Sequence, residues 1–406
     1  MSCHPRVTEW TTTIQTHLPH LSKPQATVLA LWSLGMVLAR SCALTAVSAL
    51  LATWLPRKED AVRQQWRAVC YEATAKRGTA RHALGVETGF VPLLGWVVAQ
   101  WEGPQLALAL DATTLGPRLT VLALSVVSRG CAIPVAWTLL PATAKHAWRR
   151  AWWRLLRQIR RAVPGSWTVS VLADRGVDAR WLCRRLTRLG WHPFLRINTG
   201  GTLRPTGQGR GVPLKTLVPA PGTTWQGTGI ACQGPHRQLH CPLLACWEAG
   251  DKDPWLLLTA LPPEASTACW YGLRAWSEQG FKITTRAGWQ WQRTHLTRPD
   301  RAARLWRAVA VATLWRLRGG GEAEETIPAR TVLAVTALVP TPPRMRRATR
   351  LRLVSVFRRG WNLILVALLD QAPLPLGRFV PEPWPAVPVP EEVPLSLPEL
   401  ALPQAA

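Results

Sequence analysis

Acidic residues are scarce in this sequence. Among 406 residues there are 23 Asp and Glu against 49 Lys and Arg, which gives a formal charge of +26. This shortage excludes the composition of a typical acidic metabolic enzyme and favours a polyanionic partner, nucleic acid first and an anionic membrane surface second. Genome bias could also enrich arginine. Arginine makes forked contacts with phosphate, and the 24 tryptophans either stack on bases or pack in the core.

The sequence also lacks a disulfide framework and a long apolar run. Its nine cysteines are an odd number and form no CxxC pair, so we expect reduced thiols. The opening residues, MSCHPRVTEWTTT, do not resemble a signal peptide. Arg40 interrupts the most apolar early stretch, Thr27 to Leu55, which therefore lacks the ~20 clean residues of a membrane span. We expect a cytoplasmic protein with no membrane segment.

Residues 1–100 have the apolar spacing of helices. Leu31, Leu34 and Leu38 recur at nearly helical intervals, and a second apolar run follows at 44–55. The predicted unit is a small helical domain with basic edges. It could bind DNA, or it could be a plain packing domain.

Residues 101–197 predict an α/β unit. Three apolar strands joined by short turns come first, then a basic amphipathic helix over 145–163, a strand, a helix and a last strand. In this interpretation the first strand ends at Asp111, and Arg129-Gly130 forms a turn. The order predicts a mixed sheet flanked by helices.

The rest of the chain divides into four parts by its composition and its apolar pattern. Residues 198–260 predict a β-rich insertion, and 261–320 predict helices that end at three glycines, Gly319 to Gly321. A C-terminal helical region is expected over 321–370. The Pro-rich stretch 371–406 is expected to be an extended or disordered tail.

Three carboxylates stand out. Asp111 and Asp174 each follow a buried apolar strand, and Glu278 lies on a predicted helix. A charge in such a place is costly unless a metal, a cap or a salt bridge compensates it. Three converging carboxylates can hold two Mg²⁺ or Mn²⁺ ions about 3.5–4 Å apart, the arrangement used for phosphodiester displacement. Strand-end aspartates that only cap turns are the alternative.

The segments around these carboxylates resemble a known family. DATTL, VLADRG and YGLRAWSEQGFK look like the DDE transposases of bacterial insertion sequences, and the spacing of Tyr271, Arg274 and Glu278 fits the YREK-motif subgroup, insertion-sequence family 4-like. The resemblance covers most of residues 20–370. It implies an RNase H-like catalytic core interrupted by a β-rich insertion, with an N-terminal helical domain.

The resemblance also implies roles for individual residues. Asp111, Asp174 and Glu278 would be catalytic metal ligands for Mg²⁺ or Mn²⁺. The residues implied to bind DNA are Tyr271, Arg274, Lys282, Arg286, Arg175 and Trp255, the last by stacking on a base flipped out of the duplex. A Trp255 buried in the core is the alternative.

As for activity, the resemblance implies an enzyme that cuts the ends of its insertion sequence and joins them to target DNA. Its implied partners are the terminal inverted repeats, the target DNA and a second copy of the chain in a synaptic complex, in the nucleoid of a bacterium. The carboxylate triad, the YREK helix and the insertion all belong to this interpretation.

One residue departs from the motif. The last Lys of YREK falls on Thr285, so Lys282 or Arg286 would have to supply that cation. Two alternative functions therefore stay open: a catalytically weakened, DNA-binding relic of a transposase, and an RNase H-like nuclease. A zinc site is a further alternative for one Cys/His cluster, for which buried thiols and surface histidines are the favoured interpretation: Cys232, His236, His240, Cys241 and Cys246.

Overall fold

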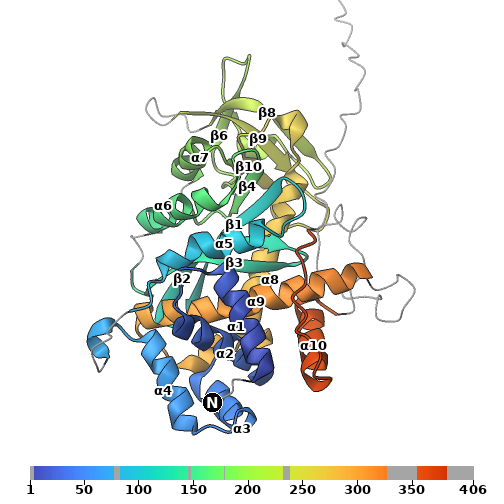
Figure 1. Cartoon of the computed structure of the whole chain (residues 1–406). Coiled ribbons are helices and arrows are strands. Elements are labelled where there is room, and N and C mark those ends of the chain that lie inside the picture. Colours follow the sequence, from blue (N-terminus) through green and yellow to red (C-terminus); the bar gives the residue numbers. More distant parts are fainter. Residues whose placement is uncertain are drawn as a thin grey trace, which may run out of the picture.

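The computed structural model describes residues 4–76, 83–144, 148–177, 179–231, 238–326 and 354–381. Figure 1 shows a central sheet with helices from both ends of the chain gathered below it and strands from the middle of the chain above it. The mixed sheet flanked by helices confirms the predicted fold class, and it is consistent with an RNase H-like fold.

The N-terminal part is helical, as predicted. Its helices are α1 (Pro5–His17), α2 (Lys23–Ala39), α3 (Leu44–Trp54), α4 (Glu59–Cys70) and α5 (Phe90–Val98). A capping box between Ser22 and Gln25 begins α2, and Arg40, in the left-handed region at φ 53°, ends it. No single helix in the described ranges is long and apolar enough to cross a membrane; α2 and α3 meet that test only as a pair bent by 97°.

Five strands form the core of the sheet in the order β3-β2-β1-β4-β5. The bounds are β1 (Gln105–Leu115), β2 (Leu119–Ser128), β3 (Cys131–Pro141), β4 (Thr168–Ala173) and β5 (His192–Arg196). β1 to β3 are an antiparallel meander, whereas β4 pairs in parallel with both β1 and β5. Arg129-Gly130 forms the predicted turn, with φ positive at both residues as a two-residue hairpin requires.

The strands of residues 198–260 continue this same sheet. They are β6 (Thr202–Pro205), β7 (Val212–Pro213), β8 (Thr224–Ala231), β9 (Leu239–Cys246) and β10 (Trp255–Leu258). β10 pairs antiparallel with β5, so the sheet runs on through β9, β8, β6 and β7 to a total of ten strands. The β-rich segment therefore lengthens the core sheet at the β5 edge.

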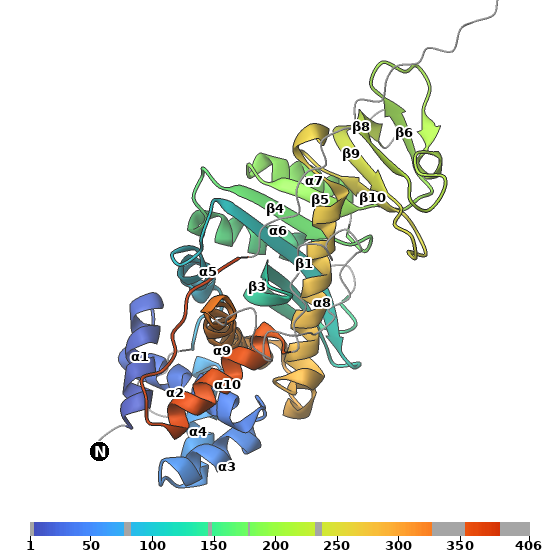
Figure 2. The same ribbon diagram turned by 90° about the vertical axis from the view of Figure 1, so that its right-hand side faces the viewer.

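The remaining helices cover the sheet and join it to the N-terminal helices. They are α6 (Trp148–Ile159), α7 (Ala179–Arg188), α8 (Ala275–Lys282), α9 (Pro299–Thr326) and α10 (Val356–Leu369). Figure 2 shows α8 running across the face of the sheet, with α9 and α10 beside the N-terminal helices. Short 3₁₀ helices lie at Ala73–Ala75, Glu87–Gly89, Arg160–Ala162, Leu214–Thr216, Pro263–Ala265, Ala268–Arg274 and Trp291–Thr294, and a π-helix lies at Ile283–Ala287.

The prediction that Gly319 to Gly321 end their helix is wrong, because α9 continues to Thr326. The glycines allow α10 to pack closely. A Cβ on Gly320 would lie 2.0 Å from the carbonyl oxygen of Val356, and one on Gly360 would lie 1.8 Å from that of Arg316. In this helix the glycines provide a contact surface.

The first part of the Pro-rich stretch, residues 371–381, is extended and held by contacts. The indole of Trp315 donates to the carbonyl of Pro375, and Arg318 donates to that of Gly377. Phe379 is buried and pairs with Trp101. A disordered tail is therefore wrong for these residues, and 382–406 lie outside the described residues.

Candidate active site

Strand register places Asp111 beside Asp174. The parallel ladder between β1 and β4 ends at the pair Leu110–Ala173, and each aspartate is the next residue on its strand. The two carboxylates therefore leave the sheet at the same level of neighbouring strands. The prediction that the first strand ends at Asp111 is wrong, because β1 stays paired with β2 as far as Leu115.

The helix α8 brings Glu278 to the same place. A 3₁₀ turn, Ala268–Arg274, leads into α8, and Glu278 lies in its first turn. The helix lies close to the sheet because residue 280 is glycine: a Cβ there would come 2.8 Å from the Cβ of Ala132 on β3. A larger side chain at this position would lift the first turn of α8, and Glu278 with it, away from β1.

The three carboxylates meet around the guanidinium of Arg274. Its Nη2 lies 3.2 Å from Asp111 Oδ2 and 3.6 Å from Asp174 Oδ2, and its Nη1 lies 2.8 Å from Glu278 Oε1. The side chains of Arg274 and Asp111 are 13% and 16% exposed, whereas those of Asp174 and Glu278 are 44% and 56% exposed. The site therefore has a buried floor and an open side.

The charge of Arg274 is well supported. Burial alone would lower the pKa of the guanidinium, but Asp111, Tyr271 and Asp174, together with the hydrogen bond to Glu278, raise it above its ordinary value. The side chain is a permanent cation among three acids. Sequence reasoning placed Arg274 on a DNA phosphate. The i,i+4 spacing of Arg274 and Glu278 is a local signal for their ion pair, whereas nothing in the sequence indicated the ion pairs with Asp111 and Asp174.

Ser277 is a site residue that sequence reasoning missed. Its side chain is buried, and its hydroxyl donates to Asp111 Oδ2 at 2.7 Å, with the carbonyl of Arg274 at 2.8 Å as the alternative acceptor. Asp111 is thus fixed by a neutral group as well as by a cation. Helical spacing offered a signal, since Ser277 lies three residues after Arg274.

Trp255 and Tyr271 form an aromatic pair beside the acids. Their ring centroids are 5.3 Å apart in an edge-to-face arrangement. Tyr271 is buried, and its hydroxyl lies 3.5 Å from Asp174 Oδ1, whereas Trp255 is only half-buried at the start of β10. Burial is the main cause of the raised pKa of Tyr271, so the phenol stays protonated.

Arg175 ties the loop after β4 to the loop before β10. Its backbone N–H donates to Asp174 Oδ1 at 2.7 Å, and its guanidinium lies 3.5 Å from Asp253 Oδ2. Asp253 is two residues before Trp255, so this ion pair links the loop of one acid to the tryptophan. Sequence reasoning missed Asp253.

The helix after Glu278 changes its winding around Thr285, the residue that stands where the motif has a Lys. α8 is followed by a π-helix at Ile283–Ala287, whose turn takes about one residue more than an α turn. In an uninterrupted α-helix the residue seven after Glu278, Thr285, would return to its face. The next residue, Arg286, is exposed, while the hydroxyl of Thr285 donates to the carbonyl of Phe281.

The donor chemistry of the site suits a hard divalent cation, because the three acids offer only oxygen ligands. Within the described residues, no three His, Cys, Asp or Glu side chains lie close enough together to hold a metal ion. Each of the three carboxylates instead contacts the guanidinium of Arg274. The donor type therefore fits Mg²⁺ or Mn²⁺, while the present partner of the three acids is an arginine.

The Cys/His cluster does not converge in the part that the structure describes. Cys232 and His236 lie outside the described residues. His240 is exposed and Cys241 is buried, because consecutive side chains on β9 point to opposite faces. Cys246 is also buried. Buried thiols and a surface histidine describe these three residues.

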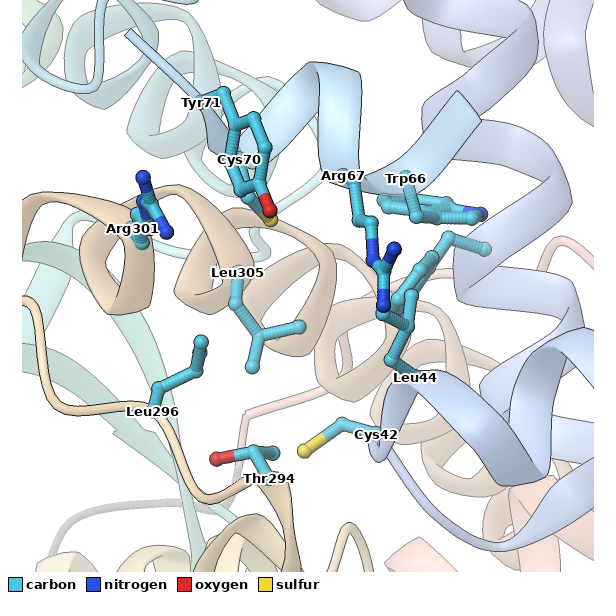
Figure 3. A pocket seen from close by; sticks show the side chains of 11 residues that line it. Cys42, Leu44, Trp66, Arg67, Cys70, Tyr71, Thr294, Leu296, Arg301 and Leu305 are labelled. Atoms are coloured by element: carbon cyan, nitrogen blue, oxygen red, sulfur yellow. The ribbon is translucent and has the colours of Figure 1, made fainter. Parts of the chain in front are cut away.

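A separate cavity of about 210 Å³ lies between the N-terminal helices and α9, as Figure 3 shows. Its lining is mostly apolar, with Arg67 and Arg301 and no acidic side chain. Burial is the main cause that raises the pKa of Cys70 in this lining to about 12, so its thiol stays protonated. The cavity shares no residue with the acidic site.

Residues 133–315 match the family model of the transposase DDE domain. The matched span begins in β3 and ends in α9, so it contains Asp174 and Glu278 and begins after Asp111. No curated protein matches the sequence. The match agrees with the family resemblance of the sequence and supports a transposase that acts on DNA, and this family generally uses divalent metal ions.

Proposed function

We propose that the protein is a DNA transposase that cuts the ends of an insertion sequence and joins them to target DNA. One observation carries the proposal: Asp111, Asp174 and Glu278 meet around one point, in a chain whose residues 133–315 match the transposase DDE domain. The formal charge of +26 suits DNA as the substrate. Because two ends must be held together, the acting species is a dimer.

The three acids would hold Mg²⁺ or Mn²⁺. Such ions, two when the site is full, supply Lewis acidity and a nucleophilic oxygen at neutral pH. Asp111 stays aligned for this role because the hydroxyl of Ser277 holds one of its oxygens. The buried floor excludes water from one side, and the open side at Asp174 and Glu278 admits the DNA backbone.

Cations and rings around the acids would position the DNA end. Arg286 is exposed one residue after the position where the motif has its Lys. Because the π turn takes about one residue more than an α turn, Arg286 would take that place on the helix and contact a phosphate. The half-buried Trp255, backed by Tyr271, offers a ring on which an unpaired base can stack. Arg175 would keep the loops of Asp174 and Trp255 in register through Asp253.

The direct test is cleavage of DNA copied from both flanks of the coding region, with Mg²⁺ and the full-length protein. A transposase releases 3′-hydroxyl ends at fixed positions and joins them to a second duplex. Binding without cutting would instead indicate a weakened relic, and cutting of any duplex without joining would indicate a nuclease.

Trp255→Ala should slow the steps that need a distorted end more than it slows the first nick. Stacking of a base on an aromatic ring is worth about 1–3 kcal/mol, so we expect the cleavage steps that need an unpaired base at the DNA end to slow by about tenfold. Because the ring is half-buried, the melting temperature should change little. Gels that resolve each cleavage step, run beside a melting curve, measure both.

Trp270→Ala is the matched control for that variant. Trp270 is buried against Phe194, with ring centroids 5.7 Å apart, so its loss costs about 3–5 kcal/mol of stability. All steps should then fall together. If Trp255→Ala behaves in the same way, with a large drop in melting temperature, the stacking role is wrong.

Arg286→Ala should weaken binding of the element's end more than Lys282→Ala does. A charge-assisted contact is worth about 1.5–3 kcal/mol, so we expect a loss of about tenfold or more at Arg286. Both residues are exposed and equal in charge, and only Arg286 lies beyond the added residue of the π turn. Binding titrations on the same duplex compare them, and equal losses would refute the role of the π turn.

A further inference from the structure

We propose that Arg274 couples DNA binding to metal binding by holding the three carboxylates until a DNA phosphate takes its guanidinium. The inference rests on the proposed function and goes beyond it, because it assigns to one side chain the exchange between two ligands. In this account the arginine is a positioning residue with two successive anionic partners.

The first step is the competition for the acids. One guanidinium contacts Asp111, Asp174 and Glu278, at 3.2, 3.6 and 2.8 Å, so it uses oxygens from the whole candidate ligand set. A divalent cation at the same oxygens would lie within a few ångströms of a buried positive charge. Like charges repel strongly in such a place, so the cation and Arg274 cannot share the three acids.

The second step is the other partner of the arginine. A buried guanidinium that leaves its carboxylates needs another anion, and phosphate matches its forked donors. Arg274 already has one donor to spare, because its Nε is buried and has no hydrogen-bond partner among the described residues. Once the guanidinium turns away from the acids, a phosphate on the open side of the site, where Asp174 and Glu278 are exposed, could accept from its donors.

Ser277 keeps the site in order during the exchange. Its hydroxyl holds Asp111 Oδ2 at 2.7 Å independently of the guanidinium. The side chain is buried on the helix that carries Glu278, so Asp111 stays aligned with that helix when Arg274 moves. The carboxylate least exposed to solvent is thus the one with a neutral anchor.

The exchange has a thermodynamic consequence. If DNA takes Arg274 from the acids, DNA raises the affinity for metal, and metal raises the affinity for DNA by the same factor. Couplings of this kind are typically about 5- to 150-fold. Under this proposal, removal of Arg274 strengthens metal binding in the absence of DNA. If Arg274 were merely structural, its removal would disorder the acids and weaken metal binding.

The test measures Mn²⁺ binding to the full-length protein, alone and with a duplex copied from the DNA that flanks the coding region, by titration calorimetry. For the natural sequence we expect the duplex to raise the Mn²⁺ affinity by about tenfold. Arg274→Gln should bind Mn²⁺ more tightly without DNA and should lose the coupling. Arg274→Lys keeps the cation and should bind Mn²⁺ as the natural sequence does.

Arg378→Gln is the matched control, since it removes the same charge from an exposed ion pair with Glu102. It should keep both the basal Mn²⁺ affinity and the coupling. Weaker Mn²⁺ binding by Arg274→Gln, with an unchanged melting temperature, would overturn the proposal, and so would a coupling that survives in that variant. If the natural sequence binds no duplex, the proposed function fails as well; if it binds and cuts DNA without any coupling, only this inference fails.

Discussion

Asp111→Asn, Asp174→Asn and Glu278→Gln should each abolish strand cleavage while DNA binding survives. Each change keeps the shape of the side chain and removes one charged oxygen ligand. A metal ion in this chemistry is worth several kcal/mol, and each 1.4 kcal/mol is about tenfold in rate, so we expect losses of about a thousandfold or more. Binding rests mainly on Lys and Arg, so it should survive and fall by no more than the roughly tenfold share that bound metal contributes.

The measurement pairs a cleavage gel with a binding titration on the same end-containing duplex in Mg²⁺. Glu264→Gln is the matched control: it removes one negative charge from an exposed residue outside the acidic site. It should cut at the normal rate. A variant of Asp111, Asp174 or Glu278 that keeps nearly normal cleavage would remove that residue from the catalytic set.

Much of the fold could be predicted because periodicity is local. Alternating or fully apolar runs indicated β1 to β5, and the amphipathic spacing indicated α6 and α7. The place of Asp111 and Asp174 was indicated by the same information, because each residue comes directly after a buried apolar run. The parallel pairing of β1 with β4, which puts the two aspartates side by side, is seen only in the structure.

What failed to be predicted depends on contacts between distant segments. From the sequence alone, the glycines in α9 indicated a helix end. Their role depends on α10, because Gly320 on α9 and Gly360 on α10 let the two backbones come close together. The ion pairs of Arg274 with Asp111 and Asp174 arise because α8 crosses the sheet at one particular height. Local pattern carries no information about either contact.

The same limit applies to the continuation of the sheet. The pattern of residues 198–260 indicated strands. It did not indicate their partners, because the pairing of β10 with β5 joins segments about 60 residues apart. That pairing matters to the site, because β10 begins at Trp255 and so sets the tryptophan beside Tyr271. The sequence indicated the aromatic residue, and the long-range pairing decides what it can touch.

The basic helices on one side of the sheet are expected to make the largest contribution to the salt dependence of DNA affinity. α6 buries an apolar face and exposes Arg150, Arg154 and Arg157, and α7 beside it exposes Arg184. The two helices are in contact, because the guanidinium of Arg185 lies 4.9 Å from the ring of Trp153. Exposed arginines on two neighbouring helices suit contacts with a phosphate backbone.

DNA affinity should therefore fall steeply with salt. Each neutralised phosphate contributes about −0.9 to the slope of log affinity against log salt, and a protein with about 6–10 such contacts loses about 10³- to 10⁵-fold between 50 and 200 mM. We expect the natural sequence to lie in this range, since it carries a formal charge of +26. The change of Arg150 and Arg157 to Gln should reduce the slope by about two. Arg378→Gln, whose partner Glu102 already neutralises it, should leave the slope unchanged.

Fluorescence anisotropy on a labelled duplex measures all three slopes. A nearly flat plot for the natural sequence would contradict DNA as the partner, and an unchanged slope in the double variant would remove α6 from the DNA-binding surface.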